Sequence, residues 1–190
     1  MARIREKISW VLSDSVVLDP TQDLAELKHV GSFWGSWRTW RACQTDNVIC
    51  HDQVKAADLV QREFQNLCNL YIPNSVNASL DRPDNVRVYG GEFAQDVTRQ
   101  EEIVALHLAA SVSDIVLLLG FDFSTQARLD DPLLEHQAAN YRGLVRQTIL
   151  DNDHIQWVVV DHPADFREDL QGLSNLVKDS LGGILSLFAG

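Results

Sequence analysis

Short apolar segments rich in β-branched residues recur along this chain, separated by stretches in which apolar residues keep a helical spacing. Five such segments stand out, at residues 8–18, 48–50, 86–89, 115–119 and 157–160. Continuous apolar runs of this length, bounded by polar residues, are typical of strands buried on both faces of a parallel sheet. Because strands and helices alternate repeatedly, the sequence predicts an α/β fold.

The stretches between these segments predict the helices. Asp52 stands before apolar residues that recur every three or four positions as far as Tyr71, so we expect a helix capped by Asp52 that ends near Pro73. Thr98 and Glu101 have capping-box spacing for the next helix. Two further helices are expected, one over residues 131–150 and one that carries the stripe Phe166, Leu170, Leu173 and Val177 and is interrupted at Gly182 and Gly183.

The most economical architecture is one Rossmann-like domain over residues 1–190. We expect three layers, with about five mostly parallel strands between helices on both faces. The strand count is too low for an eight-fold barrel. The apolar tail, residues 182–190, is expected to dock on this core in preference to a partner, although a homo-oligomer remains open.

The net charge and the cysteine spacing indicate which binding partners and which cellular compartment to expect. The net charge of −11 argues against nucleic acid and against an anionic membrane surface, since both attract basic proteins. No apolar run approaches the roughly 18 residues of a membrane span, and the N-terminus lacks a signal-peptide pattern. Cys43, Cys50 and Cys68 have irregular spacing, which favours buried, reduced thiols in a cytoplasmic protein. The expected partner is therefore a small molecule.

Each predicted strand delivers a carboxylate to one edge of the sheet. Ligands of open parallel sheets bind beyond the carboxyl ends of the strands, so these residues are the candidate site. We expect catalytic roles for His51, Asp52 and Asp122, ligand contacts at Gly90, Gly91, Glu92 and Gly120, and a divalent metal near Asp14 and Asp161. The structural alternative is that these aspartates cap the helices that follow.

An aromatic and basic stretch, GSFWGSWRTWR at residues 31–41, is the second unusual feature. On a helix, Phe33, Trp37 and Trp40 would share one face. We expect the aromatic side chains to be anchored in the core, although a ring could instead stack on a base or sugar face. Arg38 and Arg41 are the best candidates in so acidic a chain for binding a phosphate or carboxylate. Neither a G-x-G-x-x-G nor a P-loop pattern occurs, so a nucleotide would have to bind without those loops.

The unit SDIVLLLGFDFS, centred on residues 114–124, resembles the strand and turn of Rossmann-like proteins of the motility-accessory-factor type. That group is similar to the 6-hydroxymethylpterin pyrophosphokinase-like proteins and, more remotely, to bacterial sialyltransferases. Their LLGxD element follows a helix rich in small residues, as ALHLAASVSD does here. The resemblance implies nucleotide or nucleotide-sugar binding, with Gly120 and Asp122 beside the ligand. The glycine-rich turn usual after the first strand of that group is not evident.

Three functional hypotheses follow. The first is a protein that binds a nucleotide or nucleotide-sugar and acts as a small glycosyl- or phosphotransferase. The second is a metal-dependent phosphoester hydrolase or nuclease that uses the strand-end carboxylates Asp14, Asp52, Asp122 and Asp161. The third is a non-catalytic interaction module on the same scaffold. Transfer is favoured over hydrolysis, and no cofactor other than a divalent metal is indicated.

Overall fold

One parallel sheet organises the chain. The computed structural model describes residues 7–14, 27–62, 68–77, 84–89, 100–121, 123, 132–161, 166, 168 and 170–188, and within them eight strands pair in the order β5-β4-β3-β2-β1-β6-β7-β8. Every neighbouring pair is parallel. The strands are β1 (Ile8–Leu12), β2 (Ser32–Ser36), β3 (Asn47–Ile49), β4 (Asn69–Pro73), β5 (Val86–Tyr89), β6 (Ile115–Leu119), β7 (Gln156–Val160) and β8 (Leu176–Asp179).

The strand order reverses once, between β1 and β6. The chain builds outward from β1 to β5, and then helix α5 (Gln100–Ala110) brings it back to β6 on the other side of β1. The two central strands pair along their full length, from Ile8 opposite Ile115 to Leu12 opposite Leu119. In open α/β sheets a ligand binds at the carboxyl ends of the strands where the order reverses. The topology therefore directs attention to the ends of β1 and β6.

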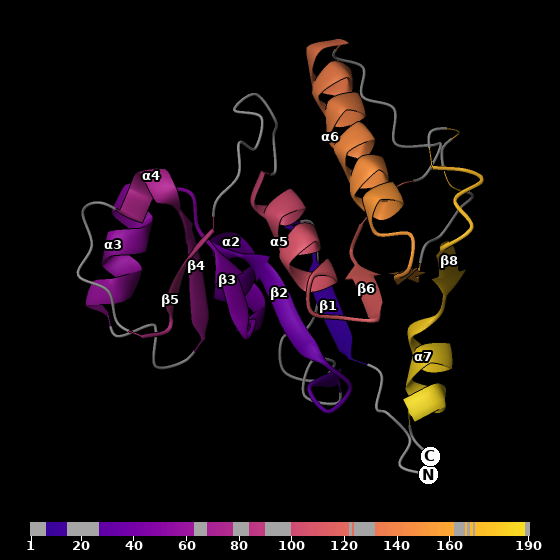
Figure 1. Cartoon of the computed structure of the whole chain (residues 1–190), viewed down its shortest axis with the longest axis horizontal. Helices are drawn as coiled ribbons and strands as arrows, with labels where there is room; N and C mark the ends of the chain where they lie inside the picture. The colour runs from indigo at the N-terminus through magenta and orange to yellow at the C-terminus, as the bar shows by residue number, and fades with distance from the viewer. Residues whose placement is uncertain are drawn as a thin grey trace.

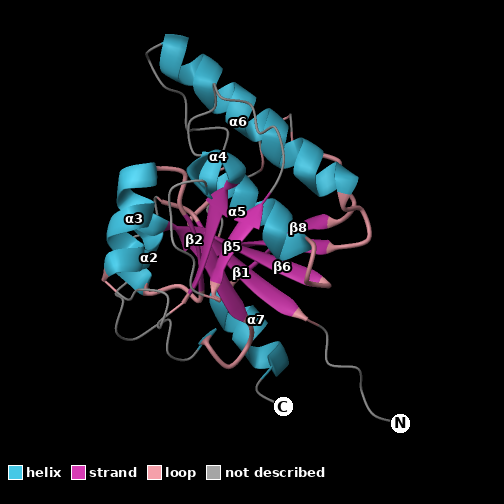
Figure 2. Ribbon diagram, turned by 60° about the vertical axis from the view of Figure 1, so that its left-hand side comes forward, coloured by secondary structure: helices cyan, strands magenta, loops and turns pink. Residues whose placement is uncertain are grey.

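Helices cover both faces of the sheet. On one face, α5 and α6 (Pro132–Asp151) pack over side chains such as Val11, Leu118 and Trp157. On the other lie α2 (Trp37–Cys43), α3 (Gln53–Gln61) and α7 (Leu181–Phe188). Figure 1 shows α5 in front of the central strands, and Figure 2 shows α6 and α7 on opposite sides of the sheet. A short helix, α4 (Asn74–Asn77), follows β4. The predicted three-layer α/β fold is confirmed, with eight strands in place of about five.

Strand β2 is one of three that the sequence prediction lacks. Residues 31–41 do not form one helix with Phe33 on the face of Trp37 and Trp40. The helix begins at Trp37, because the Ser36 hydroxyl caps it by accepting the backbone N–H groups of Arg38 and Thr39. Gly31 brings the start of β2 against β1, since a Cβ there would lie 2.4 Å from the carbonyl oxygen of Ile8. Phe33, Trp34 and Gly35 therefore belong to a buried central strand, whereas Trp37 and Trp40 lie in α2.

Strands β4 and β8 replace parts of predicted helices. The helix capped by Asp52 ends at Gln61, and residues 69–73 form a strand in which Leu70 and Ile72 are buried. Val177 lies in β8 and not on a helical stripe. In both segments the spacing of the apolar residues is compatible with a helix and with a strand. Pairing with a neighbouring strand determines that each segment is a strand. The first strand ends at Leu12, whereas the sequence predicts a strand as far as residue 18.

Other expected elements are confirmed. The helix predicted at 131–150 is α6, β5 and β6 have the predicted bounds, and Asp52 caps α3 through the backbone N–H groups of Val54 and Lys55. The interruption expected at Gly182 and Gly183 is wrong, because α7 runs through both. Within the part of the chain that the structure describes, no helix has the length and apolar character needed to cross a membrane.

Helix α7 offers a direct test of how the tail contributes to stability. Ile184 is 2% exposed and belongs to the apolar cluster that contains Trp10 and Leu119, whereas Leu187 on the same helix is 72% exposed. Replacing Ile184 with alanine should lower the free energy of unfolding by about 2–4 kcal/mol, measured by urea denaturation. The control Leu187→Ala should change it by less than about 0.5 kcal/mol. Equal losses in the two variants would contradict this packing.

Candidate active site at the β1–β6 switch point

Ser13 and Asp14 occupy the point where the strand order reverses. They follow β1 directly, and the Ser13 backbone N–H donates to the carbonyl oxygen of Leu119 at the end of β6 (3.0 Å). Ser13 is buried and Asp14 is half-buried. The ends of the two central strands are thus joined at the place where the fold predicts a ligand.

The carboxylate of Glu102 connects three elements at this point. Glu102 lies in the first turn of α5 and is 0% exposed. Its Oε1 accepts the Ser13 hydroxyl at 2.9 Å and the Asp14 backbone N–H at 2.6 Å, and its Oε2 accepts the Tyr141 hydroxyl of α6 at 2.5 Å. A buried carboxylate is tolerated when such donors surround it. Glu102 therefore holds α5, α6 and the end of β1 in a fixed arrangement.

Asp14 is bound from its other side by the start of α2. Its Oδ1 accepts the hydroxyl of Ser36 in a short hydrogen bond and the hydroxyl of Thr39 at 2.9 Å. Ser36 meanwhile caps α2, so its oxygen accepts helix N–H groups while its proton goes to Asp14. The side chain of Asp14 is consequently held in one orientation between the ends of β1 and β2.

Glu101, beside Glu102 in the sequence, has a different environment. Its Oε1 accepts the backbone N–H of His51 at the end of β3 (2.9 Å). Burial raises the pKa of this carboxyl to about 7, and the negative charge of Asp14 adds to the rise, while the His51 hydrogen bond and the charges of Arg38 and Lys55 oppose it. A carboxyl group with a pKa near 7 can both accept and donate a proton at neutral pH, which is the property required of a general acid or base.

The predicted residues His51 and Arg38 lie at this edge. Burial lowers the pKa of the His51 imidazole, whose ring lies 5.8 Å from that of Tyr89 between centroids. Arg38 is exposed in the first turn of α2, and its charge stabilises ionised Glu101. Gly120 is exposed directly after β6 with a φ of 77°, a conformation that glycine adopts without strain. Its predicted role beside a ligand stays a prediction.

Asp52 and Asp161 have local structural partners. Asp52 caps α3, and the hydrogen bond from the Lys55 backbone N–H is the main reason that its pKa is lowered. Asp161 accepts the backbone N–H of Leu181 at the start of α7 (3.0 Å). Because β2, β1 and β6 lie between β3 and β7, these two aspartates are separated by four strand spacings, roughly 19 Å. The structure does not bring them into one site.

The other predicted site residues either are not described by the structure or lie away from this edge. Gly90, Gly91, Glu92 and Asp122 lie outside the described residues. Among the described residues, no group of three His, Cys, Asp or Glu side chains could hold a metal ion. The metal expected near Asp14 and Asp161 therefore has no support among these residues and stays a prediction. The three cysteines are buried, and no disulfide joins them. Arg41 lies over the ring of Trp37, 5.5 Å from its centroid.

Sequence reasoning missed Glu101, Glu102 and Tyr141. The capping-box pattern drew attention to Glu101 only as a helix-start residue, and Thr98 of that pattern lies outside the described residues. A usable signal was present: two adjacent carboxylates open an otherwise apolar helix, and that helix is the crossover into the clearest strand. Tyr141 offered no comparable signal, because its role depends on how α6 packs against α5.

In comparisons with known proteins, no family model matches this chain, and no curated protein matches it significantly.

The pKa of Glu101 predicts a pH dependence of stability. Its folded-state value of about 7 exceeds the ordinary 4.5, so the folded protein holds an additional proton between these pH values. The stabilisation is therefore complete below about pH 4.5 and is lost as the pH rises to about 7. We expect the free energy of unfolding, relative to the variant Glu101→Gln, to fall by up to about 3 kcal/mol across this range.

This difference can be measured by urea denaturation of both proteins between pH 4 and 8. The variant Glu168→Gln is a suitable control, because Glu168 is exposed and the same substitution there should keep the wild-type pH profile. A constant difference between wild type and Glu101→Gln would show that Glu101 does not titrate in this range.

Proposed function

We propose that this protein binds a nucleotide or nucleotide-sugar at the carboxyl ends of β1 and β6 and transfers a glycosyl or phosphoryl group. The observation that carries this proposal is that Asp14 and Glu102 meet at the only reversal of strand order among the described strands, with Glu101 adjacent to Glu102 on α5. Nucleotides bind at this position in doubly wound sheets. The local resemblance of residues 114–124 to nucleotide-binding Rossmann-like proteins supports the same ligand class.

The polar groups at this edge suit a sugar. Carboxylates accept hydrogen bonds from sugar hydroxyls, and an acidic residue near the switch point commonly binds a ribose in this architecture. Asp14 is oriented by Ser36 and Thr39 and is half-buried, which suits a fixed acceptor. Arg38, exposed at the same edge, is the cation suited to neutralise a phosphate in the absence of a glycine-rich loop.

Glu101 supplies the proposed chemistry. As a general base it would take the proton of the acceptor hydroxyl, whose oxygen then attacks the anomeric carbon or the phosphorus while the nucleotide phosphate departs. Its pKa near 7 allows it to be ionised for this step and protonated afterwards. Glu102 is engaged by donors on both oxygens and is therefore a positioning residue. The predicted catalytic role of Asp122 stays open.

Ligand-dependent thermal stability tests the binding proposal. A panel of nucleotides and nucleotide-sugars, each with and without Mg²⁺ or Mn²⁺, should contain a member that raises the melting temperature, because a ligand at 100 times its Kd stabilises the fold by about 2.7 kcal/mol. The variant Asp14→Asn should weaken this binding at least tenfold, whereas the exposed control Asp153→Asn should not. The proposal fails if no panel member shifts the melting temperature.

Glu101→Gln separates binding from transfer. The amide preserves the shape of the side chain and removes its ability to take a proton, so ligand binding should persist while turnover falls by about 10²–10⁴-fold. The measurement is transfer from the ligand found in the panel, with Asp153→Asn as control. Equal turnover in Glu101→Gln and wild type would remove Glu101 from the reaction. Binding without turnover in the wild type would favour the non-catalytic hypothesis.

A further inference from the structure

A cavity of about 590 Å³ lies between α2 and α3, apart from the carboxylate cluster. Its lining contains none of Ser13, Asp14, Glu101 or Glu102. The helices that form it belong to the α2–α3 face, whereas Glu101 and Glu102 come from α5 on the opposite face of the sheet. The volume is within the range of small-molecule sites, about 300–1,000 Å³. The cavity is therefore large enough for a ligand of its own.

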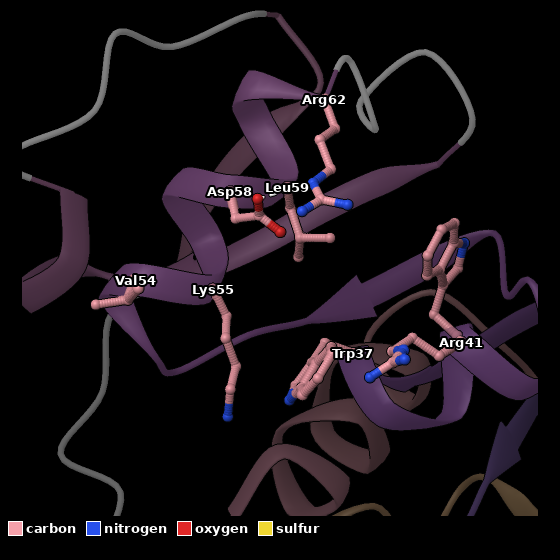
Figure 3. A pocket seen from close by; sticks show the side chains of 8 residues that line it. Trp37, Arg41, Val54, Lys55, Asp58, Leu59 and Arg62 are labelled. Atoms are coloured by element: carbon pink, nitrogen blue, oxygen red, sulfur yellow. Dashed lines mark hydrogen bonds and ion pairs between the residues drawn. The ribbon is translucent and has the colours of Figure 1, made fainter.

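The cavity is positively charged in a strongly acidic chain. Arg41 of α2, Lys55 of α3 and Arg62 at the C-terminal end of α3 line it, against one carboxylate, Asp58. The Nε–H of Arg62 donates to Asp58 at 2.7 Å, which engages one nitrogen of the guanidinium. Figure 3 shows the guanidinium groups of Arg62 and Arg41 entering the space from opposite sides. Among the described lining residues, three cations and one anion leave an excess positive charge, although the whole chain carries −11.

Arg41 has no anionic partner in the part of the chain that the structure describes. Its guanidinium lies over the Trp37 ring, which the Lys55 amine also approaches to 4.7 Å from the centroid. Lys55 pairs with Asp52 at 3.3 Å, but Arg41 forms no ion pair with a described residue. A neutral ring holds such a cation in place without cancelling its charge. Arg41 is thus positioned for an anion that the described residues do not provide.

The other lining side chains are apolar. Trp37, Trp40, Val54 and Leu59 account for four of the eight lining residues that the structure describes. Inorganic phosphate alone would leave this surface uncovered. A flat apolar body between the helices would fill it, with its charged end on the two guanidinium groups.

We infer that this cavity binds a small aromatic oxyanion, a ring that carries a phosphate or a carboxylate, held between Arg41 and Arg62. The guanidinium forks match either oxyanion, because both present two oxygen acceptors in one plane. This inference concerns a second site and does not depend on the nucleotide site at the end of β1.

Calorimetric titration with phenyl phosphate and with benzoate tests the inference and distinguishes the two oxyanions. At least one of them should bind, whereas benzyl alcohol and inorganic phosphate, which each lack one half of the ligand, should bind at least tenfold more weakly. The indole N–H resonances of Trp37 and Trp40 should shift during the titration, while those of the buried Trp10, Trp34 and Trp157 should not.

Charge variants locate the site. Arg41→Gln and Arg62→Gln should each weaken binding at least tenfold, while the exposed Arg146→Gln on α6 makes the same charge change and should leave binding unchanged. Arg62→Lys should recover only part of the loss, because an ammonium group lacks the planar fork. All three arginines are exposed, so the variants should keep the wild-type melting temperature.

The inference is overturned if neither phenyl phosphate nor benzoate binds the wild type. It is also overturned if Arg41→Gln and Arg62→Gln leave binding unchanged, or if Arg146→Gln weakens it equally. Loss of binding in Asp14→Asn would place the ligand at the β1 end instead. Failure of the nucleotide panel with intact binding of an aromatic oxyanion would reject the proposed function and leave this inference standing.

Discussion

The buried carboxylate of Glu102 is the constraint on which the arrangement of the candidate site depends. A carboxylate without donors in the protein interior would cost several kcal/mol, and here the donors come from different parts of the chain: Ser13 and Asp14 after β1, and Tyr141 on α6. Satisfying one side chain therefore fixes the first turn of α5 against the end of β1 and against α6. Because α5 is the crossover between the two halves of the sheet, the same interaction sets the geometry of the switch point.

Two adjacent carboxylates in one helical turn thus have opposite roles. Glu102 is surrounded by donors and serves the structure, whereas Glu101 is desolvated with the His51 backbone N–H as its hydrogen-bond donor, and its pKa rises to about 7. The difference arises from their positions on α5, because successive helical residues point about 100° apart. Glu102 faces the end of β1, and Glu101 faces the end of β3. One turn of helix therefore supplies both an anchor and a group that titrates near neutral pH.

The sequence predicts the fold class well because its strongest signals are local. The run at β6 and the long period of α6 leave little choice between helix and strand, and both are found where expected. Strands β2, β4 and β8 contain no continuous apolar run as long as that of β6, and their apolar residues also fit a helical spacing. Their state depends on pairing with strands far away in sequence, as when Trp34 of β2 lies opposite Val11 of β1. Propensity within a short window contains no information about such a neighbour.

The site is less predictable than the fold because it depends on strand order. Each of the five predicted strand ends offered an acid, but the strand order separates Asp52 from Asp161 and brings Asp14 to a glutamate 88 residues away. The two arginines of α2 show the same limit. Arg38 and Arg41 are three residues apart and looked like one anion-binding pair, yet Arg38 acts on Glu101 at the sheet edge and Arg41 lines the cavity beside α3. A seven-residue helix therefore separates an acidic edge suited to sugar hydroxyls from a basic cavity suited to an oxyanion.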